Sequence, residues 1–375
     1  MFDNLETPRL ILDIERLKAN AQPFIDKAAQ LGLMLRPHLK TSKSLDVARI
    51  AKNGDSSGFT VSTLKEAEYF IRDGLTSILY TGAVTQNKFD RVRHIGEINN
   101  ERLLLVTDSL EAAQAAVTYT QEHACHFDFL IEVDCGEHRS GLPFGSTKII
   151  DIAATLHKGE YTHFRGVMTH AGHSYSTNDR TKLAQIAEAE RSAAVDAANL
   201  LSEAGFDCEI VSIGSTPTFL RADHLDGITE VRAGIYLFWD LAQYSRGVCN
   251  LNDIAMSVLS TVIGHNRQGS SIILDAGALA MSKDIGANTF LPDARYGYVC
   301  DPVTMERIDQ LSIDVVHQEH GTVNVKDDSL FERLPIGAKV RVLPNHACLT
   351  AAPYQSYTVI EDDRIIDEWV KVTGW

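Results

Sequence analysis

The chain has 375 residues, of which 44% are hydrophobic and 23% are charged. This length and composition are sufficient for one large domain with a smaller one, or for two domains of ordinary size. The 35 basic and 50 acidic residues give a formal net charge of −15, which argues against a surface for nucleic acid or for an anionic membrane.

The N-terminal residues and the cysteines indicate in which cellular compartment the protein is expected. The first residues, MFDNLETPR, contain acids and no apolar segment, so we expect no secretory signal. No apolar run approaches the length of about 18 residues that a membrane-spanning helix needs. The six cysteines are scattered without a CxxC pair, which is typical of reduced thiols. We therefore expect a cytoplasmic protein.

Short apolar runs alternate with helical patterns from residue 9 to about residue 240. The expected strands are residues 9–14, 33–38, 58–61, 77–81, 103–107, 128–133, 164–169 and 209–213. The clearest helices between them are residues 15–30, 63–72, 109–119 and 179–204. Eight strands with intervening helices predict an α/β fold, a (β/α)8 TIM-type barrel. An open doubly wound sheet is the alternative, but the chain has no GxGxxG fingerprint and no P-loop.

From about residue 250 the pattern changes to strands joined by turns. The expected strands are residues 256–265, 271–276, 311–318, 339–343, 357–361 and 365–371. Strands without long helices between them predict an antiparallel β-domain. We therefore expect a barrel over residues 8–245 and a smaller antiparallel β-domain. The β-domain consists of residues 246–375 together with residues 1–7.

Lys40 stands where the second apolar run ends. The residues before the segment RPHLKTSK, Leu31 to Leu35, have the length and composition of a buried strand. A lysine at the carboxyl end of a barrel strand lies on the face where barrel enzymes carry out chemistry. Partial burial there favours a neutral amine, which can hold a carbonyl cofactor as a Schiff base. The alternative is a solvated loop lysine before a helix.

Polar residues also follow later strands of the expected barrel. Residues 134–141 follow the sixth strand, His170 follows the seventh, and Gly214-Ser215-Thr216 follow the eighth. The last segment offers backbone amides and two hydroxyls at a strand-to-helix turn, which suits a phosphate group. An ordinary helix cap is the alternative interpretation of that turn.

A second cluster lies in the expected β-domain, in the segment PNHAC. Residues two apart on a strand point to the same side, so His346 and Cys348 could present an imidazole and a thiolate together. This pair suits zinc or another transition metal and leaves positions open for substrate. The alternative is a packing histidine beside a buried thiol. Asp240 and Asp275 are expected either as caps or as supporting groups.

Three segments together resemble the fold-type III pyridoxal-phosphate enzymes, and within them the D-serine dehydratase and D-threonine aldolase group. They are RPHLKTSK, RAGIYLFWD from Arg232, and PNHAC. The more distant alanine racemases share the barrel, the strand that bears the lysine, and an Arg-x-Gly-Ile pattern that is Arg232-Ala-Gly234-Ile235 here. The resemblance covers essentially the whole chain.

The resemblance implies that Lys40 holds pyridoxal 5′-phosphate, and that Arg139 and Tyr175 are catalytic residues beside it. It places Arg139 at the phenolic oxygen of the cofactor, His170 at the ring, and Arg232 opposite the pyridine nitrogen. It assigns the phosphate to Gly214, Ser215, Thr216, Gly234, Ile235 and Tyr236.

His346 and Cys348 match the metal ligands of the zinc-dependent D-serine dehydratases. The compared aldolases usually carry aspartate at the position of Cys348, together with a harder metal. A thiolate favours zinc or cobalt, and manganese is a further candidate. The resemblance therefore implies a lyase that dehydrates a D-β-hydroxy amino acid such as D-serine or D-threo-3-hydroxyaspartate.

Other activities use the same or a similar set of residues. A D-threonine aldolase-like cleavage needs the same lysine and metal, so it is the main alternative. An amino-acid racemase needs a second base instead of a metal, and a non-catalytic pyridoxal-phosphate-binding protein generally lacks the β-domain. The relatives are usually homodimers, so we expect a homodimer that acts on a small molecule and contacts neither nucleic acid nor membrane.

Overall fold

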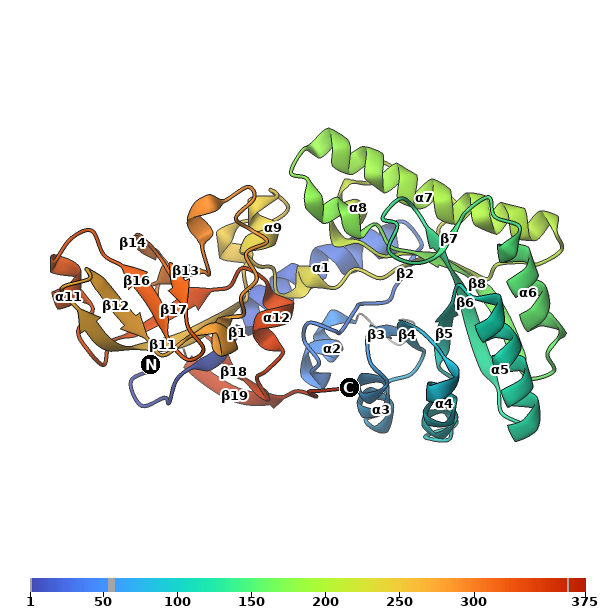
Figure 1. Ribbon diagram of the computed structural model, residues 1–375, viewed down its shortest axis with the longest axis horizontal. Helices are drawn as coiled ribbons and strands as arrows, with labels where there is room; N and C mark the ends of the chain where they lie inside the picture. The colour runs from blue at the N-terminus through green and yellow to red at the C-terminus, as the bar shows by residue number, and fades with distance from the viewer. Residues whose placement is uncertain (1, 53–57, 363) are drawn as a thin grey trace. The chain divides into compact units, whose positions relative to one another are not determined.

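The computed structural model describes residues 2–52, 58–362 and 364–375, and it divides into two compact units (Figure 1). The barrel unit comprises Pro23–Gly234 with Gly374–Trp375, and the β-unit comprises Met1–Gln22 and Ile235–Thr373. Residues 8–22 and 235–245, which the sequence assigned to the barrel, therefore group with the β-unit. Helix α1 (Ile14–Gln30) contains the first boundary.

The barrel unit is built on eight parallel strands. They are β2 (Met34–Leu35), β3 (Phe59–Val61), β4 (Ile78–Ala83), β5 (Leu104–Thr107), β6 (Phe127–Asp134), β8 (Thr162–Thr169), β9 (Ile210–Ile213) and β10 (Glu230–Val231). Their order is β2-β10-β9-β8-β6-β5-β4-β3, and β7 (Leu142–Pro143) pairs with the end of β6. A parallel bridge between His38 and Thr60 joins the two edge strands, so parallel pairing runs around the barrel. The predicted parallel barrel is confirmed.

Helices lie on the outer side of these strands (Figure 1). They are α2 (Leu45–Ala51), α3 (Leu64–Arg72), α4 (Phe89–Gly96), α5 (Leu110–His123), α6 (Lys148–Lys158), α7 (Arg180–Glu203) and α8 (Thr216–Arg221). Side-chain caps on Thr63, Ser109 and Asp179 begin α3, α5 and α7, which satisfies amides that a helix start leaves unpaired. Inside, a cluster of apolar side chains from β4, β5, β6 and β8 forms a core, namely Leu79, Leu104, Val106, Leu130 and Met168.

The β-unit is a mixed sheet structure. Its strands are β1 (Arg9–Asp13), β11 (Met256–Asn266), β12 (Ser271–Leu274), β13 (Tyr298–Cys300), β14 (Arg307–Ser312), β15 (Val315–Val316), β16 (Gly321–Asn324), β17 (Lys339–Leu343), β18 (Ser356–Glu361) and β19 (Arg364–Val370). The main order is β14-β13-β17-β11-β1-β18-β19, while β12, β16 and β15 continue from β11. Short helices connect them, namely α9 (Leu241–Ser245), α10 (Ala278–Met281), α11 (Ser329–Arg333) and α12 (Ala347–Ala351).

Strand β1 corrects two expectations. The sequence placed residues 9–14 in the barrel, but β1 pairs antiparallel with β11 and parallel with β18 in the β-unit. The short strand β10 takes the eighth position in the barrel instead. The parallel β1–β18 pair makes the β-unit mixed rather than purely antiparallel. The apolar run Leu10-Ile11-Leu12 is fully buried, and burial on both faces does not reveal which sheet a strand joins.

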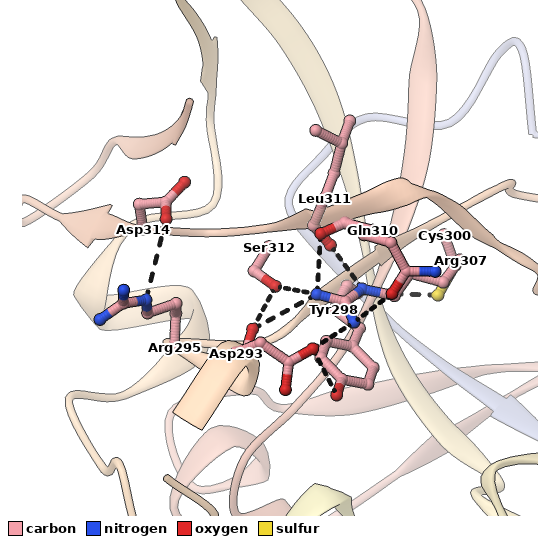
Figure 2. A network of polar contacts seen from close by, with 9 residues as sticks. All are labelled: Asp293, Arg295, Tyr298, Cys300, Arg307, Gln310, Leu311, Ser312 and Asp314. Atoms are coloured by element: carbon pink, nitrogen blue, oxygen red, sulfur yellow. Dashed lines mark hydrogen bonds and ion pairs between the residues drawn. The ribbon is translucent and has the colours of Figure 1, made fainter. Parts of the chain in front are cut away.

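Arg307 organises the hairpin of β13 and β14 in the β-unit (Figure 2). Its guanidinium lies 3.5 Å from the centre of the Tyr298 ring. Its hydrogen-bond acceptors include Leu311 O at 3.1 Å, Gln310 O at 2.8 Å, Ser312 Oγ at 2.7 Å and Asp293 Oδ2 at 2.6 Å. We call these residues the Arg307 cluster. Its acceptors match the donor fork of an arginine, so the cluster holds the hairpin together.

Candidate active site

Lys40 lies in the loop after β2, beside the bridge that joins the edge strands of the barrel. Its side chain is exposed, so the partial burial expected from the sequence is not seen. Its ammonium group makes no hydrogen bond or ion pair with any residue in the described part of the chain; only its backbone N–H contacts His38 Nδ1, at 3.4 Å. The amine is therefore available to a ligand.

Two histidines lie within electrostatic reach of Lys40. Burial, followed by the positive charge of Lys40, lowers the pKa of His170 to about 3. The same two causes lower the pKa of His38 well below its ordinary value. Both imidazoles are therefore neutral at physiological pH and can give or accept a hydrogen bond without adding charge.

Arg232 is buried and anchored inside the barrel. Its Nη2 donates to the Thr169 carbonyl at 2.7 Å, and its Nη1 donates to Ser212 Oγ. Its charge also contributes to the lowered pKa of His38 and of His170. Lys40 and Arg232 each contribute positive charge near His170, and positive charge attracts an anionic ligand.

The turn after β9 has the features of a phosphate site. Ser215 precedes α8, and its Oγ lies 2.7 Å from Ser174 Oγ. Thr216 Oγ1 is buried and has no hydrogen-bond partner among the described residues. A buried hydroxyl without a partner is costly, and a phosphate oxygen would satisfy it. A side chain on Gly214 would place its Cβ 2.5 Å from Arg232 Nη2, so only glycine fits there.

The other predicted cofactor residues are less closely gathered. Arg139, in the loop after β6, forms a 3.3 Å ion pair with Glu137 and contributes to the lowered pKa of His170. Tyr175 is half-buried in the short helix η2 (Gly172–Ser176). A Cβ on Gly234 would lie 2.5 Å from the His38 carbonyl oxygen. Ile235 and Tyr236 lie at the start of the second segment of the β-unit, in the short helix η3 (Ile235–Leu237), and are buried. Their roles stay predictions.

The spacing of His346 and Cys348 suggested that both lie on a strand, but the structure places neither of them on one. Strand β17 ends at Leu343, before Pro344, and His346 caps helix α12, which contains Cys348. The two side chains nevertheless share a hydrogen bond. The first turn of a helix therefore brings together what the sequence assigned to one face of a strand.

Asp284 orients the imidazole of His346. Its Oδ2 lies 2.9 Å from His346 Nδ1. Burial opposes the charged imidazole, but the hydrogen bonds from Asp284 and Cys348 outweigh it and raise the pKa of His346 to about 11. Metal-binding histidines commonly give their second nitrogen to a carboxylate in this way. Nε2 and the thiol are thus the donors that a metal would use.

This donor set fits a metal with two protein ligands. The described residues contain no group of three or more histidine, cysteine, aspartate or glutamate side chains placed to hold a metal. Water or substrate would therefore complete the coordination, as in catalytic rather than structural metal sites.

Asp240 and Asp275, which the sequence left between two roles, have different partners. Asp240 caps α9 through the Gln243 amide and accepts a hydrogen bond from the Ala347 amide at 2.9 Å. It therefore supports the segment that carries His346. Asp275 accepts from Ser260 Oγ, the Thr261 amide and Thr7 Oγ1, so it links strands.

Sequence reasoning missed three residues beside the predicted ones: in the barrel unit His38, near Lys40, and Glu190, which accepts from the Ala171 and Gly214 amides, and in the β-unit Asp284, the partner of His346. His38 could have been found, because it stands two residues before Lys40 in the same segment after β2. Asp284 is 62 positions from its partner, and Glu190 lies in the middle of α7. Nothing in their local patterns distinguishes them from surface acids.

The chain matches two family models. The alanine racemase N-terminal domain matches residues 12–241, and the serine dehydratase domain matches residues 255–360. None of the helices in the described ranges is long and apolar enough to cross a membrane.

Characterised relatives are similar along their whole length. The D-threo-3-hydroxyaspartate dehydratase of Delftia sp. (strain HT23) is 40% identical over 99% of this chain and 98% of its own. The D-serine dehydratase of Dictyostelium discoideum is 31% identical over 100% of this chain and 98% of its own. The solved structure of the Delftia dehydratase has a TM-score of 0.96, with 39% identity over 100% of this chain and 99% of that chain. A cysteine-to-alanine mutant of a D-threo-3-hydroxyaspartate dehydratase has been solved in a metal-free form.

Proposed function

Because this chain belongs to the family with an alanine racemase N-terminal domain and a serine dehydratase domain, we propose that it is a pyridoxal-phosphate- and metal-dependent lyase that dehydrates a D-β-hydroxy amino acid. The resemblance predicted from the sequence is thereby confirmed. The observation that carries the proposal is the His346–Cys348 pair with Asp284 behind it, since a racemase has no use for such a pair.

The barrel unit supplies the cofactor residues. Lys40 would bind pyridoxal phosphate covalently, with the phosphate at Ser215 and Thr216. When bound, the cofactor supplies an electron sink for the charge that develops at Cα of the substrate. Lys40 Nζ would take the Cα proton, because a neutral lysine amine beside the substrate can act as a general base. Neutral His38 and His170 orient groups without competing for that proton.

The β-unit supplies the metal residues. His346 Nε2 and Cys348 Sγ would hold the ion, and an imidazole–thiolate pair favours zinc, with cobalt or manganese as alternatives. When bound, the metal supplies a Lewis acid for the β-hydroxyl group, which leaves as hydroxide. Asp284 keeps the His346 ring in place, as a carboxylate behind a ligating histidine does.

Substrate assays with the purified protein test this function. D-threo-3-hydroxyaspartate and D-serine should each be assayed for keto acid and ammonia, with D-threonine assayed for glycine and aldehyde. Lys40→Ala should lower kcat/KM by at least about a thousandfold, since it removes both the covalent link and the base. Lys158→Ala, at the exposed end of α6, is the matched control. Aldehyde release without ammonia would replace the proposal with a D-threonine aldolase-like function.

Metal content tests the second half of the proposal. Cys348→Ala should lower bound zinc, measured by atomic emission, to below about a tenth of the wild-type amount, because two protein ligands hold the ion where structural sites use four. Cys125→Ala, half-buried after α5, is the control. Chelator-resistant ammonia release by the wild type would remove the metal from the proposed function. The expected homodimer stays a prediction, for which light scattering should give twice the chain mass of 41.4 kDa.

A further inference from the structure

We propose that Glu190 is a positioning residue that, as a neutral acid, fixes the two loops around the cofactor phosphate. The inference rests on the proposed function, because it concerns the same site. Glu190 lies on α7 and is fully buried. It would act by holding the backbone of those loops, through the Ala171 and Gly214 amides, rather than by contacting the cofactor.

The Glu190 carboxyl group connects three elements of the barrel unit. Its Oε1 accepts hydrogen bonds from the Ala171 amide at 2.8 Å and from the Gly214 amide at 3.2 Å. Its Oε2 lies 2.5 Å from Thr218 Oγ1 on α8. One side chain therefore ties α7 to the loop after β8 and to the turn after β9.

Those two loops carry the candidate cofactor contacts. Ala171 directly follows His170, and Gly214 directly precedes Ser215 and Thr216. Their amides lie just beyond β8 and β9, where the strand ladders no longer bind them. Without Glu190 these buried donors would lose their acceptor, which costs free energy and leaves the loops free to shift.

The contacts of Thr218 leave room for a neutral acid. The Thr218 hydroxyl has one hydrogen, and its Oγ1 lies 3.0 Å from the Ser215 carbonyl as well as 2.5 Å from Glu190. If that hydrogen goes to Ser215 O, the hydrogen between Glu190 and Thr218 must come from the acid. Burial, the largest influence, raises the pKa of Glu190, which agrees with this arrangement. The charged or titratable groups that face Glu190 are Arg232 and Cys135.

A neutral acid also suits the expected ligand. A carboxylate at this position would place a negative charge close to the phosphate, in a region of low dielectric. A carboxylic acid instead gives one hydrogen to Thr218 and accepts two from the backbone. Glutamine has nearly the same shape and likewise presents an acceptor oxygen on one side and a donor group on the other, so it should replace Glu190 with little loss.

Cofactor affinity tests this proposal without relying on turnover. The purified protein is stripped of cofactor, and pyridoxal phosphate or pyridoxal is titrated back while the absorbance of the lysine-linked cofactor is followed. Pyridoxal lacks the phosphate, so it reports Lys40 and the ring site alone. Glu190→Ala should raise the dissociation constant for pyridoxal phosphate at least about tenfold, the value of one or two lost hydrogen bonds. The same variant should change the dissociation constant for pyridoxal by less than about twofold. Glu190→Gln should keep the dissociation constants for both ligands near the wild-type values.

Several outcomes would overturn the proposal. Equal losses for both ligands in Glu190→Ala would indicate a general structural role, and a Glu190→Gln variant as weak as Glu190→Ala would indicate a required charge. If Glu190→Ala does not fold, Thr218→Val replaces it: weaker binding of pyridoxal phosphate alone supports the proposal, and unchanged binding contradicts it. A wild type that binds neither ligand would instead refute the proposed function itself.

Discussion

Two arginines organise polar clusters in the two units, and they differ in what surrounds them. Arg307 in the β-unit donates hydrogen bonds to acceptor atoms of its own hairpin and to the carboxylate of Asp293 (Figure 2). Arg232 in the barrel unit also has buried acceptors, Ser212 and Thr169. Arg232, however, lies within electrostatic reach of the neutral His170 and beside Gly214, and the turn that begins at Gly214 contains Thr216, whose buried hydroxyl has no partner among the described residues.

The difference separates a structural network from the binding site that we propose. A polar network with matched donors and acceptors stabilises one conformation and offers nothing to a ligand. A buried cluster that keeps one hydroxyl unpaired and two imidazoles neutral has a cost that a bound anion can offset. Burial of an arginine does not by itself indicate a binding site. Buried polar groups nearby that have no hydrogen-bond partner favour one.

Removing the structural arginine should give the largest change in stability. Arg307→Met should lower the free energy of unfolding by about 3 kcal/mol, because it leaves two backbone carbonyls and Ser312 without their donor. Urea unfolding measures this loss. Arg333→Met in the same unit is the control, since its exposed ion pair with Asp309 should contribute below about 1 kcal/mol. Equal losses in both variants would contradict the assignment of the Arg307 cluster.

The unpartnered hydroxyl should give opposite effects on stability and binding. Thr216→Val should leave the cofactor-free protein as stable as the wild type, or slightly more stable, because the buried group has no partner to lose. It should raise the dissociation constant for pyridoxal phosphate about tenfold, the value of one hydrogen bond to a charged group. Thermal unfolding and cofactor titration measure the two effects, and a destabilised variant with unchanged affinity would reverse the interpretation.

The lowered pKa of His170 should give the smallest effect, visible in the pH dependence of stability. The pKa is about 3 in the folded chain against an ordinary value of 6.5. As the pH falls below 6.5, the unfolded chain binds a proton that the folded chain does not, so stability decreases. Between about pH 7.5 and pH 5.5 this costs about 1.4 kcal/mol.

Urea unfolding of cofactor-free protein at the two pH values checks this expectation. His170→Asn should lose that part of the pH dependence, while His94→Asn, which changes an exposed histidine, should keep it. A wild type and a His170→Asn variant with the same slope would show that His170 is protonated in the folded chain.

The sequence predicted the barrel and most of its elements because strand and helix periodicities are local. It also singled out Lys40 and the turn at Gly214 as candidates, because Lys40 follows the apolar run that contains β2 and Gly214 directly follows β9. It misplaced β1, since an apolar strand pairs with partners that its own residues do not specify. It singled out His346 and Cys348 but predicted a strand there. The strand ends before Pro344, and a helix begins after His346. Asp284 and Glu190 act over long sequence separations, where no pattern reveals them.

The position of β1 has a consequence for how the chain folds during synthesis. Its neighbours β11 and β18 are made some 250 and 350 residues later, so the strand emerges long before either partner exists. All of the barrel unit except Gly374 and Trp375 lies between β1 and β11 in the sequence, so it can mature first. Until the last strands leave the ribosome, Leu10 to Leu12 form an uncovered apolar edge of the kind that chaperones bind.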